Sequence, residues 1–150
     1  MIVLERLLSA IARMLKEPRL KIVGFSKVVH NEDSEGEFID LYFTVKNTGG
    51  DRAEDCEIRA KVKSISKDFY YVTHMPFSLN AGIDTKIYFQ QIIKNEQRTR
   101  SLSKNSPILE IGKIYEYEIR FSGVNFKDEK KHKLKLDLSS WENIEVILDC

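Results

Sequence analysis

The chain has 150 residues, of which 42% are hydrophobic and 31% charged, a composition typical of one globular domain. This composition excludes a mainly disordered chain and a fibrous repeat. Lys and Arg number 24 against 23 Asp and Glu, which gives a net charge of +1. The whole molecule therefore has no field that attracts nucleic acid or a charged membrane, and any charged binding surface must be local.

Residues 1–17 have the period of an amphipathic helix, which Pro18 is expected to end. Glu5, Arg6 and Arg13 interrupt the apolar residues, so the segment matches neither a secretory signal nor a membrane span. Three interpretations stay open for this helix: packing on its own domain, contact with a protein partner or a second copy, and docking on a membrane surface. The residues predicted to form its contact surface are Leu4, Leu7, Leu8, Ile11 and Leu15.

From residue 18 onward the pattern alternates between apolar and polar residues, which indicates β-strands with one buried face. The predicted strands are 20–28 with a kink at Gly24, 39–46, 56–63, 69–73, 83–93, 115–121, 134–138 and 144–148. In the segment 83–93, the residues expected on one face are Ile83, Thr85, Ile87, Phe89, Gln91 and Ile93. Seven or eight short antiparallel strands predict an immunoglobulin-like β-sandwich over residues 18–150, because no helical segments separate the strands as a parallel sheet requires.

Turns and loops are predicted where polar residues and glycine interrupt this alternation. Asn47-Thr48-Gly49-Gly50 contains residues that tolerate positive φ and is expected to turn the chain. Asn31–Glu37 is an acidic loop, and Asn80-Ala81-Gly82 is a further turn. The polar stretch from Lys94 to Pro107 lacks periodicity and is expected to be a loop or a mobile excursion.

Three of these motifs together resemble the CARDB-type and related immunoglobulin-like domains over about residues 19–138. They are Phe43-Thr44-Val45-Lys46-Asn47-Thr48-Gly49-Gly50 followed by Ala53, Leu79-Asn80-Ala81-Gly82 before an alternating strand, and Gly112-Lys113-Ile114-Tyr115-Glu116-Tyr117-Glu118-Ile119. The resemblance implies a non-catalytic module with a role in adhesion or protein interaction. This chain departs from the family pattern by its single copy, its leading helix and its lack of an export signal.

The chain contains two cysteines, Cys56 and Cys150, without metal-type spacing. So few cysteines suggest a reducing, cytoplasmic setting, although sequence alone leaves a single bridge between them open. Cys56 falls in the apolar phase of its strand, which predicts an inert core thiol.

Metal and calcium sites receive little support. The loop Asn31–Gly36 has oxygen ligands at the first positions of an EF-hand pattern, but Tyr42 occupies the twelfth position, where that pattern requires Glu. A solvated turn is therefore expected, with weak calcium binding as the alternative. His30, His74 and His132 are dispersed and predict no metal site.

No motif of a recognisable enzyme occurs in the sequence, including G-x-S-x-G, the P-loop, H-E-x-x-H and G-x-G-x-x-G. We therefore expect a non-enzymatic interaction module without a cofactor, whose contact surface is the helix or an exposed strand edge. The alternative is a nucleic-acid or polyanion binder. Its predicted anion patch comprises Lys94, Arg98, Arg100 and Lys104. Weak carbohydrate binding is a lesser alternative, through exposed aromatic residues among Tyr70, Tyr71 and Tyr88.

Overall fold

The structure is a computed structural model that describes residues 2–32, 36–101, 103, 105–128 and 130–149, and their side chains except at 2, 10–15, 32 and 149. Within these residues the elements are α1 (Ile2–Lys16), β1 (Leu20–Glu32), β2 (Gly36–Asn47), β3 (Ala53–Val62), β4 (Tyr70–Tyr71), β5 (Phe77–Leu79), β6 (Asp84–Ile93), β7 (Arg98–Arg100), β8 (Ile114–Ser122), β9 (His132–Asp137), one turn of 3₁₀ helix (Trp141–Asn143) and β10 (Glu145–Asp149).

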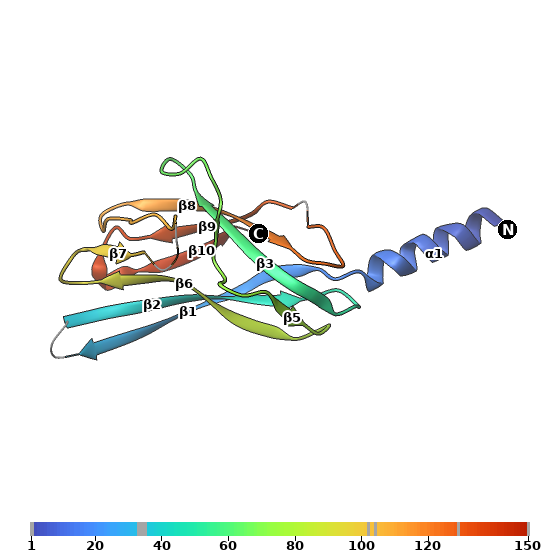
Figure 1. Ribbon diagram of the computed structural model, residues 1–150, viewed down its shortest axis with the longest axis horizontal. Coiled ribbons are helices and arrows are strands. Elements are labelled where there is room, and N and C mark those ends of the chain that lie inside the picture. The colour runs from blue at the N-terminus through green and yellow to red at the C-terminus, as the bar shows by residue number, and fades with distance from the viewer. Residues whose placement is uncertain (1, 33–35, 102, 104, 129, 150) are drawn as a thin grey trace.

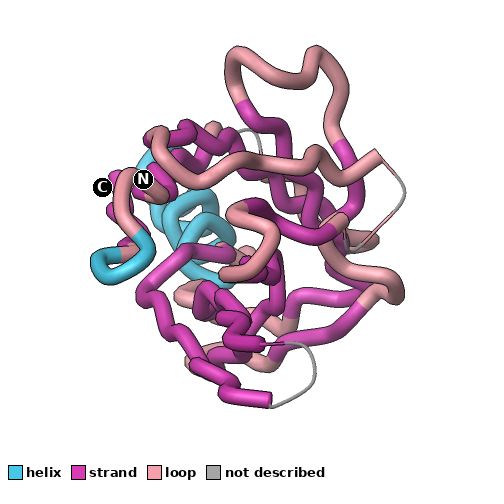
Figure 2. Tube along the Cα trace, turned by 90° about the vertical axis from the view of Figure 1, so that its left-hand side faces the viewer, coloured by secondary structure: helices cyan, strands magenta, loops and turns pink. Residues whose placement is uncertain are grey.

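The strands form two antiparallel sheets that face each other, so the predicted all-β sandwich is confirmed (Figures 1 and 2). The first sheet has the order β1-β2-β6-β7. The second has the order β10-β9-β8-β3-β4, and β5 also pairs with β3. Figure 2 looks along the long axis and shows both layers from the end.

Strict alternation places the predicted residues in the core of the sandwich. On β2, burial alternates through Ile39, Leu41, Phe43 and Val45, as the sequence pattern requires. The same rule holds in the second sheet. Its buried residues include Ile58, Val62, Tyr115, Tyr117, Ile119, Phe121, Leu134, Leu136 and Leu138. These two inner faces form one continuous hydrophobic core.

The predicted face of β6 is wrong in part, because the strand contains an irregularity. Its pairing with β2 shifts between Leu41 and Tyr42, so that Phe89 has no direct partner. Phe89 and the next residue, Gln90, are consequently both buried, while Gln91 is half-buried. Ile83, also expected inside, is 53% exposed.

The segment 94–107, predicted to be an unstructured loop, contains the strand β7. Thr99 of β7 pairs with Ile92 and is fully buried. Its Oγ1 accepts a 2.7 Å hydrogen bond from the Leu109 amide, which ties the end of the loop to the sheet. The predicted strand 69–73 is shorter than expected and consists of Tyr70 and Tyr71. The acidic loop is also shorter, since β1 continues to Glu32 and β2 begins at Gly36.

The buried side chain of Asn47 connects three backbone segments near the end of the sandwich from which α1 extends, namely the chain before β1, the turn after β2 and the end of β5. Its Nδ2 donates to the carbonyl oxygens of Asp51 at 2.8 Å and Leu79 at 2.9 Å. Its Oδ1 accepts hydrogen bonds from the Arg19 amide at 3.2 Å and the Gly49 amide at 3.0 Å. The turn is therefore specified by hydrogen bonds from an amide side chain, and Asn47 itself does not have a positive φ.

We expect Asn47→Ala to lower the free energy of unfolding by about 2–4 kcal/mol, because it removes four hydrogen bonds and leaves buried backbone groups unpaired. Urea denaturation at constant m-value measures the loss. Asn143→Ala is the control, since the Asn143 side chain is exposed, and it should change stability by less than about 0.5 kcal/mol. Equal stability of the two variants would contradict the role given to Asn47.

Cys56 is a free, fully buried thiol, in agreement with its predicted place in the core. Burial, with a smaller contribution from the negative charge of Asp55, raises the pKa of Cys56 to about 11. The thiolate is therefore disfavoured in the folded protein. The unfolded thiol titrates at its ordinary pKa of 9.0, so stability due to this group is lost as the pH rises above that value.

We expect Cys56 in a Cys150→Ser variant to react with Ellman's reagent at pH 8 on the order of 100-fold more slowly in the folded state than in urea, since reaction requires opening of the core. Absorbance at the thiolate product wavelength gives both rates. Rapid labelling of the folded protein would show that Cys56 is accessible and would refute this description.

Candidate functional site

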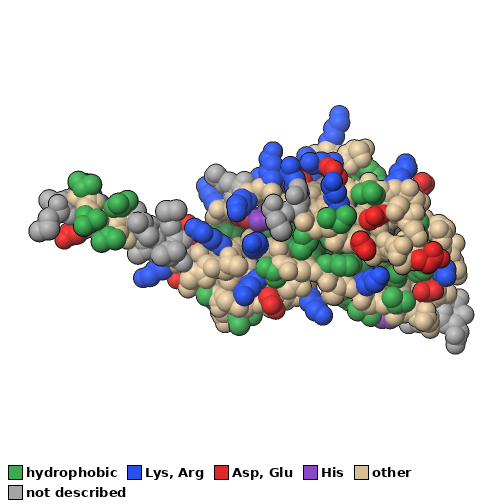
Figure 3. Space-filling model, turned by 180° about the vertical axis from the view of Figure 1, so that it is seen from behind, with side chains coloured by type: hydrophobic (Ala, Val, Ile, Leu, Met, Phe, Trp, Pro, Cys, Tyr) green, Lys and Arg blue, Asp and Glu red, His purple; other side chains and the backbone are tan. Residues whose placement is uncertain are grey.

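The helix α1 extends away from the sandwich, with its described apolar side chains uncovered (Figures 1 and 3). Val3 is 80% exposed, and Leu4, Leu7 and Leu8 are 55–58% exposed. Ile11 and Leu15 belong to the same predicted face, but their side chains lie outside the described part of the chain. Packing of this face on its own domain, one of the three interpretations, does not occur for the four described residues.

The junction between α1 and the sandwich is held by backbone contacts. Pro18 is buried, and the Thr48 amide donates a 2.7 Å hydrogen bond to the carbonyl oxygen of Arg19. Gly49 lies so close that a Cβ at this position would collide with the carbonyl oxygen of Glu17. The turn 47–50 thus fixes the point at which α1 leaves the sandwich. Within the described residues, no helix has the length and apolar character that a bilayer crossing requires.

Two of the three described residues of the predicted anion patch have carboxylate partners. Lys94 pairs with Glu37 at 3.4 Å and lies over the Trp141 ring, and Arg98 pairs with Glu96 at 3.3 Å. Arg100 is exposed at the end of β7. Lys104 lies outside the described residues.

A cationic cluster that the sequence analysis missed lies on the outer face of β3 and β8. Arg59, Lys61 and Arg120 approach the Phe69 ring, with their charged groups 5.1–5.9 Å from its centroid. The buried carboxylate of Glu118 lies 3.7 Å from Lys61 and 3.9 Å from Arg120. Cross-strand register brings these residues together, since Lys61 pairs with Glu118 and Arg59 with Arg120. Glu118 also lies 3.9 Å from Lys131, so one carboxylate offsets only part of the positive charge of this cluster.

The three histidines are far apart, and the described residues contain no cluster of three or more metal-ligating side chains. His30 pairs with Asp40 at 3.0 Å, and His132 with Asp128 at 2.7 Å. Of the loop 31–36 with its weak calcium pattern, residues 33–35 lie outside the described part of the chain.

Asp40 is also the acceptor for two groups on β6. Its Oδ1 accepts hydrogen bonds from the Tyr88 hydroxyl at 2.8 Å and from Gln91 Nε2 at 2.9 Å. Burial, followed by the hydrogen bond to Asp40, raises the pKa of Tyr88 well above its ordinary value. Tyr88 is therefore a fixed, neutral phenol that donates to Asp40 and does not act as a nucleophile.

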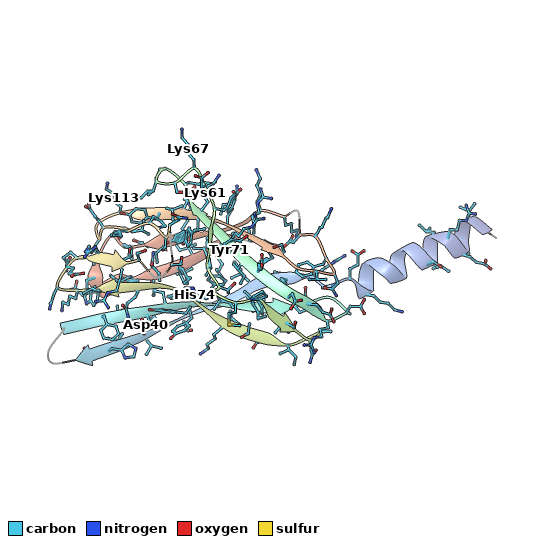
Figure 4. All side chains as sticks on the ribbon, in the orientation of Figure 1. Asp40, Lys61, Lys67, Tyr71, His74 and Lys113 are labelled. Carbon is cyan, nitrogen blue, oxygen red and sulfur yellow. The ribbon has the colours of Figure 1, made fainter. Side chains whose placement is uncertain are left out.

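Two adjoining cavities form a groove along the segment that follows β4, and the smaller of them is also lined by β6. We name it the β6 groove. The cavities have volumes of about 290 Å³ and 460 Å³. Both are lined by Tyr70, Thr73, His74 and Ser103. The smaller cavity is also lined by Val72, Lys86, Ile87, Tyr88, Phe89 and Ser106, and the larger by Glu57, Phe69, Tyr71, Met75, Pro76 and Asn105. Figure 4 labels Tyr71 at the end of β4 and His74 on the segment that leads from β4 to β5.

Buried hydroxyl groups without hydrogen-bond partners line the smaller cavity. Tyr70 is 4% exposed and Ser106 is 8% exposed, yet within the described residues neither hydroxyl has a partner in hydrogen-bond geometry. The same holds for Thr73 Oγ1. Burial raises the pKa of Tyr70 to about 12, and the nearby hydroxyls of Ser106 and Tyr117 oppose this rise. Such unpaired polar groups cost free energy unless a ligand or water completes them.

The aromatic residues singled out in the sequence, Tyr70, Tyr71 and Tyr88, all line the β6 groove. They are exposed to different degrees: Tyr71 is 54% exposed, Tyr88 is half-buried and Tyr70 is buried. The sequence points to these side chains but not to the groove, because nothing in the alternation indicates that the segment after β4, Ser103 and Ser106 lie beside β6.

No family model matches this chain, and no curated protein matches it in sequence.

Proposed function

We propose that this chain is a non-enzymatic protein-interaction module, in which the apolar face of α1 associates with a second copy of the chain. The observation that carries the proposal is the exposure of Val3, Leu4, Leu7 and Leu8 on a helix that leaves the sandwich. Four neighbouring apolar side chains on one helix face are a surface that association would remove from water.

A helix of 15 residues is only marginally stable in water unless its apolar face is packed. Burying one leucine side chain contributes about 1.5–3 kcal/mol, so the face of α1 offers enough free energy for a specific contact. A second copy presents the same face. Glu5 and Arg6 flank the apolar face and give it both signs of charge, which suits an antiparallel pairing of identical helices.

The resemblance to CARDB-type domains supports an interaction role, since the family it implies is non-catalytic. The free thiol of Cys56 supports the reducing, cytoplasmic setting that we propose with it. Polyanion binding through residues 94–104 has less support, because Lys94 and Arg98 each have a carboxylate partner.

We expect the full chain to be a dimer or larger oligomer, and Leu4→Glu/Leu7→Glu to make it a monomer, because two carboxylates cannot be buried in the apolar contact without a large desolvation cost. Size-exclusion chromatography with light scattering measures the mass. Far-UV circular dichroism should show a loss of helix in the variant, since an unpacked helix of this length unfolds.

The matched control is Lys16→Glu, which changes the net charge by the same two units from an exposed position on the polar side of α1 and should leave the oligomer intact. A monomeric full chain whose helix signal is the same as that of the Leu4→Glu/Leu7→Glu variant would contradict self-association through α1.

A further inference from the structure

We propose that the β6 groove binds an extended peptide segment of a partner protein, which adds a strand to the free part of the β6 edge. This inference concerns a second surface and does not rest on the helix contact proposed above. It is argued from the pairing of β6, the residues that line the groove and the charges around it.

One edge of β6 is largely unpaired. Along its first edge, β6 pairs with β2 from Asp84 to Ile93. Along the second edge, β7 pairs with Gln91, Ile92 and Ile93. Within the described residues, the stretch 84–90 has no strand partner and no backbone hydrogen bond on that second edge. An unpaired strand edge is a template for another strand, and in this stretch Lys86 and Tyr88 are accessible while Ile87, Phe89 and Gln90 are buried.

The groove reaches the backbone of β6 as well as its side chains. Four consecutive residues of β6, from Lys86 to Phe89, line the smaller cavity. Successive side chains of a strand point to opposite faces, so four consecutive residues can share one cavity only along the strand's edge. A ligand in this cavity therefore meets main-chain donors and acceptors, which an extended peptide satisfies more completely than a compact small molecule does.

The opposite wall supplies hydrogen-bonding groups that lack partners. Tyr70 and Ser106 are more than nine-tenths buried, and within the described residues neither hydroxyl makes a hydrogen bond of normal geometry, although the Tyr70 hydroxyl lies near those of Ser106 and Tyr117. Both residues line the cavity. A peptide lying between β6 and this wall would pair with the β6 edge on one side and meet this polar wall on the other.

The surrounding charges indicate what the peptide carries. Lys86 and His74 line the smaller cavity, and no carboxylate lines it. Arg100 is close enough to Tyr88 to lower the pKa of its hydroxyl, against the larger effects of burial and Asp40. Ile87, Phe89 and Val72 supply apolar lining. We expect a segment with an apolar side chain in the cavity and an Asp or Glu beside Lys86.

The test selects decapeptides from a random phage-displayed library on the full chain and measures the dissociation constant of the enriched peptides by calorimetry. We expect peptides rich in β-branched and acidic residues. Lys86→Glu should weaken their binding by about tenfold or more, because it places a carboxylate beside the acidic residue of the peptide. Lys21→Glu, which makes the same charge change on β1 at the other edge of the sheet, should not.

Two further measurements separate strand addition from side-chain binding. Hydrogen exchange should slow at amides within 84–90 when peptide binds. Peptides N-methylated at alternate residues should lose binding in one register and retain it in the other, because only alternate amides of an added strand face β6. The Leu4→Glu/Leu7→Glu variant should bind with unchanged affinity.

Each remaining outcome overturns the proposal. These outcomes are a library that yields no binder, binding that Lys86→Glu and Lys21→Glu affect equally, and an absence of protection within 84–90. Equal tolerance of both N-methylated sets would show that the groove recognises side chains alone and would also refute strand addition.

Discussion

The side-chain amide of Asn47 is the interaction on which the arrangement at this end of the molecule depends. It makes all four hydrogen bonds available to an amide, two as donor and two as acceptor, while fully buried. One bond holds the chain just before β1 and another holds the end of β5, so elements from both sheets share one anchor. Because α1 precedes that point, its departure from the sandwich is set by the same anchor.

The β6 groove results from the short strands at the edges of the two sheets. Strands β4, β5 and β7 have two or three residues each, and short edge strands protect a sheet from unwanted pairing. In β7, buried Thr99 and its bond to the Leu109 amide hold three residues against β6, after which the chain leaves the sheet. The same shortness leaves most of the β6 edge without a partner. The short length of β7 therefore both protects the outer edge of the sheet and leaves most of the β6 edge unpaired.

The sequence predicts the sandwich and most of its core because a period of two assigns each strand residue to one face, and β2, β3, β8 and β9 keep that period. It fails at β6, where the shift beside Phe89 depends on the register with β2. It also misses β7, whose Arg-Thr-Arg sequence has a single inward side chain and no detectable period. The sequence does not predict the β6 groove either. Tyr70 and Ser106 lie beside β6 because of tertiary packing, and a local residue pattern carries no information about tertiary packing.

The charged residues on the outer face of β3, β8 and β9 are relevant to the kind of partner that this protein binds. Lys61, Arg120 and Lys131 share Glu118, and Lys63 and Lys135 share Glu116, so these two carboxylates offset only part of the positive charge on this face. The cations nearest an aromatic ring, Arg59, Lys61 and Arg120, already contact Phe69. Lys61 and Arg120 also share the carboxylate of Glu118. The apolar face of α1 and the unpaired main chain of β6 have no such competing contacts within the described residues, and both are surfaces that another polypeptide completes.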